Sequence, residues 1–84
     1  MKSKHLKTIT LIYKRPVSGN VPWREIEALF SVLGAKKIER EGSRVAIIFG
    51  GQVHVFHRPH PSPNTDKGAI TSIRKILEAN GVSP

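Results

Sequence analysis

The sequence predicts an α+β domain in which helices pack on one face of a three-stranded antiparallel sheet. The stretch 42–61 holds two β-branched apolar runs joined by Gly50-Gly51, a pair suited to a tight hairpin turn. Segments 22–33 and 66–80 repeat apolar residues at helical spacing. The 84 residues suffice for one domain with a small core.

The hairpin has a definite register if its loop is the two glycines. Arg44 then lies opposite His57, Ala46 opposite Val55, and Ile48 opposite Val53. These pairs form an apolar face that ends in Arg44 and His57, while His54 falls on the other face. A cation beside an imidazole at the end of an apolar face is the first indication of a functional site.

Residues 1–21 form an N-terminal extension, which we expect to be a short helix followed by a turn-rich connector. Ser3 is a candidate N-cap. The apolar positions at helical spacing are Leu6, Ile9, Ile12 and Tyr13. The Thr-Ile-Thr-Leu-Ile run would also suit a strand, but the spacing favours the helix.

The domain itself spans residues 22–84 and begins with a helix that opens at Pro22 and ends at Gly34. Its apolar stripe consists of Trp23, Ile26, Leu29, Phe30 and Leu33. Trp23 could stack on a nucleic-acid base, but its place on this stripe favours the core.

Residues 35–40 are a charged edge-strand candidate with Ile38 directed inward. After the hairpin, prolines between 58 and 65 forbid regular structure. The last helix is capped by Thr65 or Asp66 and ends at Asn80-Gly81. Its outer face is predicted to show Lys67, Arg74 and Lys75. The expected order is helix, helix, strand, strand, strand, helix.

The charge distribution favours a polyanionic partner. The net charge is +8, and neither residues 1–22 nor residues 42–65 contain an acid. Lys and Arg contacts to phosphates release counterions and dominate nucleic-acid affinity. Nucleic acid is therefore the first expectation, with an acidic protein partner or a merely solvated basic surface as alternatives.

Composition also excludes several classes. The chain has no cysteine, which removes disulfides, thiolate zinc sites and cysteine nucleophiles. Charges interrupt the N-terminal apolar residues, so we expect no signal peptide, no membrane contact and a cytoplasmic location. No phosphate loop or dinucleotide-binding glycine pattern is present.

His54, His57 and His60 recur at three-residue intervals, which raises the possibility of a metal site. Strand alternation turns His54 and His57 to opposite faces, and no carboxylate lies nearby in sequence. We therefore expect no metal and no other cofactor.

Metal-independent RNA cleavage needs a base for the 2′-hydroxyl, an acid for the leaving oxygen and cations for the phosphorane. His57, His60, Arg44 and Arg58 supply these types of group within one hairpin and its exit. An ordinary basic surface around a nucleic-acid groove would contain the same residues, and spacing does not separate the two interpretations.

Residues 22–82 resemble the HicA toxin family of bacterial toxin–antitoxin systems. The resemblance rests on the Trp23-Arg24 helix start, the Gly42-Ser43 step into a strand, the Arg58-Pro59-His60-Pro61 exit and the Lys67-Gly68 helix opening. It implies a fold like the double-stranded-RNA-binding domain, an mRNA-cleaving activity and an acidic antitoxin of the HicB family.

One departure from the family pattern concerns the catalytic histidine, which should follow Gly-Ser directly; here that position is Arg44. The exit histidine of the pattern matches His60. Our hypothesis is that His57, cross-strand from Arg44, supplies the displaced imidazole.

The sequence therefore predicts a HicA-like endoribonuclease that cleaves mRNA and inhibits translation. The predicted catalytic residues are His57, His60 and Arg44. The predicted RNA-binding residues are Ser43, Arg44, Arg58, Lys67, Arg74 and Lys75. The alternatives are a non-cleaving RNA-binding module, in which Arg44 records a lost nuclease, or a module that chiefly binds the antitoxin.

Overall fold

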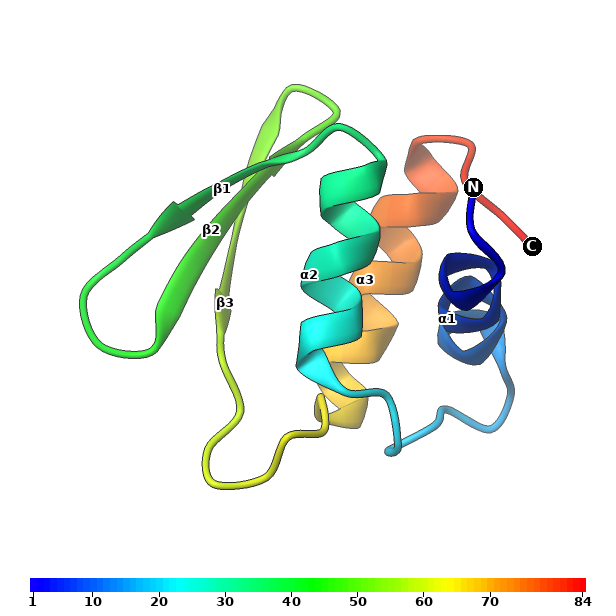
Figure 1. The fold of residues 1–84 in the computed structure, drawn as a ribbon, viewed down its shortest axis with the longest axis horizontal. Coiled ribbons are helices and arrows are strands. Elements are labelled where there is room, and N and C mark those ends of the chain that lie inside the picture. Colours follow the sequence, from blue (N-terminus) through cyan, green and yellow to red (C-terminus); the bar gives the residue numbers. More distant parts are fainter.

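Three helices and a three-stranded antiparallel sheet follow one another in the predicted order. The computed structural model describes all residues, Met1–Pro84. The elements are α1 (Ser3–Tyr13), α2 (Trp23–Val32), β1 (Lys36–Glu39), β2 (Arg44–Phe49), β3 (Gln52–His57) and α3 (Lys67–Ala79). The predicted α+β class, with an antiparallel sheet and all helices on one side of it, is confirmed (Figure 1).

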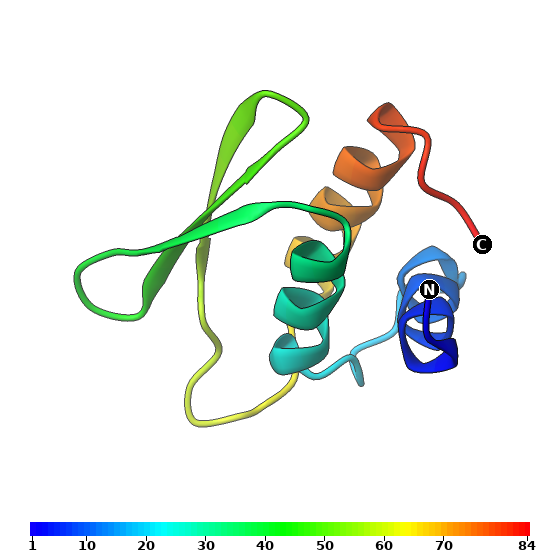
Figure 2. The ribbon, with the colours of Figure 1, turned by 45° about the horizontal axis from the view of Figure 1, so that its top comes forward.

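The elements form three layers. The sheet is one outer layer, α2 and α3 cover one of its faces, and α1 lies on their far side (Figure 1 and Figure 2). Both chain termini lie on the α1 side of the molecule, away from the sheet (Figure 1).

The glycine pair forms the predicted hairpin turn. Gly50 and Gly51 have φ values of 61° and 76°, the left-handed conformation that a primed two-residue turn requires. The turn places Phe49 opposite Gln52. The register between β2 and β3 is therefore the predicted one throughout.

The core lies between the sheet and the two central helices and continues to α1. The fully buried aliphatic residues include Ile26 and Leu29 of α2, Val45 and Ile47 of β2, Ile70, Ile73 and Leu77 of α3, and Ile9 and Ile12 of α1. Trp23 is also buried and packs against Phe56 at 5.5 Å between ring centroids. The core interpretation of Trp23 is confirmed.

The N-terminal helix differs in detail from its prediction. Its buried face consists of His5, Thr8, Ile9 and Ile12, whereas Leu6 is exposed. Lys2 occupies the N-cap, so the prediction that Ser3 caps this helix is wrong. Only one stripe of the helix meets α2 and α3, and Leu6 lies outside that stripe.

The prediction that Ile38 points inward is also wrong. Ile38 is 44% exposed and pairs with Ala46 on the side of the sheet away from the helices. Lys37 and Glu39 take the inward positions, because β1 lies at the sheet edge, where these charges reach partners on α2 and beyond β3.

Candidate functional site

The face of the sheet that points away from the helices is open. Side chains alternate between the two faces along each strand. In β2, Val45 and Ile47 are buried against the helices, so the residues that alternate with them point away from the helices. This outer face consists of Lys36, Ile38, Arg44, Ala46, Ile48, Val53, Val55 and His57. It is apolar along its middle, basic at its ends, and contains no acidic residue.

Arg44 and His57 meet at one end of the outer face. They are cross-strand partners, and both are exposed. Arg58 N donates to Ser43 O at 2.8 Å, so Ser43 and Arg58 form a hydrogen-bonded pair. Such pairs alternate with non-hydrogen-bonded pairs along an antiparallel ladder, and the neighbouring Arg44–His57 pair is therefore of the second kind. Side chains of such pairs approach more closely than those of hydrogen-bonded pairs.

Both side chains of this pair are available to a ligand. The only hydrogen bond of the Arg44 guanidinium runs from Nε to the backbone oxygen of Glu41, at 3.4 Å. The His57 ring has no hydrogen-bond or ion-pair partner. A planar guanidinium and an imidazole thus share a surface where phosphate oxygens could be bound and protons transferred.

Arg58, next in the chain, is placed differently. Its Nε donates to Glu27 Oε2 at 2.7 Å, and its Nη2 donates to Glu39 Oε2 at 2.7 Å. Lys37 Nζ donates to Glu27 Oε1 at 3.0 Å, and the Trp23 indole N–H also donates to Glu27. This cluster ties the exit of β3 to α2 and β1, on the side of the sheet away from His57.

The cluster holds its acids ionised. Burial alone would raise the pKa of the Glu27 carboxyl, but hydrogen bonds from Arg58, Lys37 and Trp23 outweigh it and lower that pKa to about 2. The hydrogen bond from Arg58 lowers the pKa of Glu39, and the two carboxylates raise the pKa of Arg58. The Arg58 guanidinium therefore already has two anionic partners.

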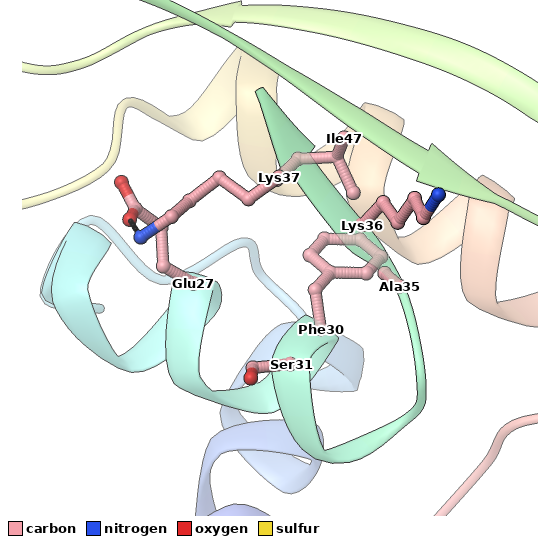
Figure 3. Close-up of a pocket in the computed structure, with 7 residues that line it drawn as sticks. All are labelled: Glu27, Phe30, Ser31, Ala35, Lys36, Lys37 and Ile47. Carbon is pink, nitrogen blue, oxygen red and sulfur yellow. Dashed lines mark hydrogen bonds and ion pairs between the residues drawn. The ribbon is translucent and has the colours of Figure 1, made fainter. Parts of the chain in front are cut away.

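A small cavity of about 150 Å³ lies beside this cluster, between the C-terminal half of α2 and β1 (Figure 3). Phe30, Ala35 and Ile47 supply its apolar lining, and the Glu27–Lys37 ion pair lies at one end. None of the predicted site residues lines it.

The remaining predicted residues do not gather on the outer face. Ser43 is exposed in the turn before Arg44, and His60 is exposed in the loop after β3. Lys67 and Lys75 are exposed on α3, which packs behind the sheet (Figure 1). Of the predicted site residues, the structure thus brings together Arg44 and His57, and Ser43 is next to Arg44 in the chain.

The prediction that Arg74 lies on the outer face of α3 is wrong. Arg74 is 6% exposed, lies near Tyr13 of α1, and its Nε is 3.8 Å from Glu78 Oε1. The α1 helix packs against α3 and covers a side that would otherwise face water. The pattern of α3 alone contains no signal for this second covering layer.

Sequence reasoning also missed Lys36, which extends the basic rim of the outer face. The alternation of side chains in β1 could have predicted its position. In a strand of four residues, however, the sequence pattern does not decide which alternate pair of side chains faces outward. The ion pair between Lys37 and Glu27 turns Lys37 inward and therefore Lys36 outward. It joins a strand to a helix, so the sequence of β1 alone does not reveal it.

The fold and the open sheet define a class, the small α+β domain of the double-stranded-RNA-binding type. Residues 23–82 match the family model described as the HicA toxin of bacterial toxin–antitoxin systems. The chain therefore belongs to the HicA toxin family, and its α1 helix lies outside the matched residues. No curated protein and no solved structure matches the chain. None of its helices has the length and apolarity needed to cross a membrane.

Proposed function

We propose that this chain is a toxin that binds and cleaves mRNA in the cytoplasm, and so inhibits translation, until an acidic antitoxin of the HicB type covers it. The observation that carries the proposal is the Arg44–His57 pair on an exposed face without acidic residues. Membership of a toxin family and a net charge of +8 support it.

The proposed chemistry is internal transesterification of RNA. His57 removes the proton of a 2′-hydroxyl, the 2′-oxygen attacks the adjacent phosphorus, and the bond from phosphorus to the 5′-oxygen breaks. His60 returns a proton to the leaving 5′-oxygen. Arg44 binds the non-bridging oxygens, where negative charge develops in the transition state. The products are a 2′,3′-cyclic phosphate and a free 5′-hydroxyl.

The proposed RNA contacts begin with Ser43 and Arg44 at the end of the outer face. Lys67 and Lys75 would bind phosphates of RNA that continues around the molecule, since their side chains are exposed. For Arg58, its two carboxylate partners favour a positioning role, in which it fixes the strand exit that carries His57. Arg74, being buried, is the weakest candidate of the set.

A non-cleaving RNA-binding module is the second candidate. The observation that favours it is Arg44 itself, which occupies the position where the family pattern has its histidine. Such a protein would retard RNA on a gel and leave it intact.

The test is an RNA-cleavage assay with chelator present. We expect wild type to cleave and His57→Ala to lose at least about a hundredfold in rate. His54→Gln is the matched control, because His54 lies on the same strand but on the face that meets the helices. Cleavage by His57→Ala at the wild-type rate would exclude the mechanism. Intact RNA with wild type would favour the second candidate.

A further inference from the structure

The strand β3 forms an open edge of the sheet. The sheet order is β1-β2-β3, so β3 pairs on one side only. Directly after β3, Arg58 N donates to Ser43 O at 2.8 Å. Because hydrogen-bonded pairs alternate along an antiparallel ladder, the even-numbered residues of β3 are the ones that hydrogen-bond to the β2 backbone. The alternation of an antiparallel ladder then turns the N–H and C=O groups of Val53, Val55 and His57 toward the free edge.

The two edges of the sheet differ in protection. The β1 edge is four residues long and carries Lys36, Lys37 and Glu39. Short, charged edge strands are a usual means by which proteins prevent the addition of another strand. The β3 edge is six residues long and contains neither proline nor lysine. Val53 and Val55 are 56% and 52% exposed beside it. The β3 edge is therefore the place where another strand could be added.

The charge around this edge indicates what kind of strand fits. Residues 42–65 contain no acid, and Arg44 and His57 are exposed at one end of β3. A second copy of the chain would bring two such acid-free segments together. A strand whose outer-face side chains are apolar at one end and acidic at the other would instead cover Val53 and Val55 and place a carboxylate beside His57, near Arg44.

We infer that an acidic, extended segment of the antitoxin adds to the free edge of β3 as a fourth strand. This inference rests on the proposed function, because the added strand inhibits the protein only if the surface beside it binds RNA. The added strand would lie beside His57 and direct its carboxylates at Arg44, so it would exclude an RNA phosphate both by volume and by charge. Main-chain pairing would supply affinity and the alternating side chains would supply specificity.

The first experiment titrates a synthetic extended peptide into the isotope-labelled protein. Every second residue of this probe, the set that shares the outer face, is valine at one end and glutamate at the other, and the residues between them are threonine. We expect the amides of Val53, Val55 and His57 to shift and to become protected from hydrogen exchange. The same peptide with lysine in place of glutamate should not bind. Methylating the backbone nitrogens on the strand-facing side of the peptide should abolish binding, whereas methylating the alternate nitrogens should not.

The second experiment changes the protein at one position. Val55→Pro removes the N–H that points to the free edge, and an edge strand tolerates proline there. We expect this variant to bind the peptide at least about tenfold more weakly. Val55→Ala keeps the N–H and should lose much less. Circular dichroism reports whether the proline variant folds. If it does not fold, binding of the methylated peptides to wild type still tests whether the peptide pairs with the backbone of β3.

Several outcomes would overturn the inference. These are equal binding of the lysine peptide, indifference to backbone methylation, or a concentration-dependent dimer of the chain that Val55→Pro abolishes. RNA cleavage by the free Val55→Pro protein separates this inference from the proposed function. If cleavage persists but the peptide fails to bind wild type, only the docking strand is refuted.

Discussion

Arg58 at the exit of β3 and Glu27 on α2 form an ion pair of 2.7 Å that crosses from the sheet to the helix layer. The Glu27 side chain is 14% exposed and accepts hydrogen bonds from three different residues. A mostly buried carboxylate with this many donors links the packing of the fold to the position of the segment that carries His57.

We expect stability to fall in acid because of Glu27. Its pKa is lowered from 4.5 to about 2 in the folded state, so its contribution is fully present above the unfolded value. That contribution is lost as pH falls from about 5 to about 2, and amounts to on the order of 2 kcal/mol. Urea denaturation of wild type and Glu27→Gln over this range measures it. Glu25→Gln, on the same helix, is the control and should keep most of the wild-type slope.

Replacing Arg44 should weaken catalysis more than folding. We expect Arg44→Ala to cut RNA about a hundredfold more slowly, because the cation at the transition-state charge is lost. Arg44→Lys should recover part of the rate, since lysine keeps the charge but not the planar fork. Arg24→Ala, which removes an equal charge from an exposed side chain on α2, serves as control. A comparable loss in both alanine variants would mean that only general electrostatics matters.

The hairpin turn should distinguish its two glycines. Both have positive φ, so each Gly→Ala change costs about 1 kcal/mol of backbone strain. A Cβ at Gly50 would also clash with the Asn80 side chain, whereas one at Gly51 meets nothing within 4 Å. Gly50→Ala should therefore be the more destabilising change in urea denaturation.

The Asn80→Ala background provides the check on that explanation. Removing the Asn80 side chain also removes its hydrogen bond to Ile76 O, so a double-mutant cycle is required. The excess cost of Gly50→Ala over Gly51→Ala should vanish in this background. If it persists, the contact between the turn and the end of α3 is not its source.

The N-terminal helix should behave as part of the cooperative fold. Ile12 is fully buried, so Ile12→Ala should lower the free energy of unfolding by about 3 kcal/mol. Leu6→Ala on the same helix, at a position 48% exposed, should change it by less than about 0.5 kcal/mol. Equal stability of the two variants would show that α1 does not pack on the domain in solution.

The sequence by itself determined the element order, the hairpin register and the pairing of Arg44 with His57. These features depend on local physics: two glycines at positive φ set the turn, and the alternation of side chains then decides which residues share a face. Helical spacing likewise identified the stripes of α2 and α3 that face the core.

Only the tertiary structure decided that Arg74 is buried, that Arg58 is paired with carboxylates and that Ile38 faces outward. Arg74 is buried because α1 covers α3, and Arg58 is neutralised by Glu27 and Glu39, which lie 31 and 19 residues away in sequence. The periodicity of a segment records which side of it is apolar. It does not record how many layers cover the segment or which distant charges it will meet, because those are set by packing between elements.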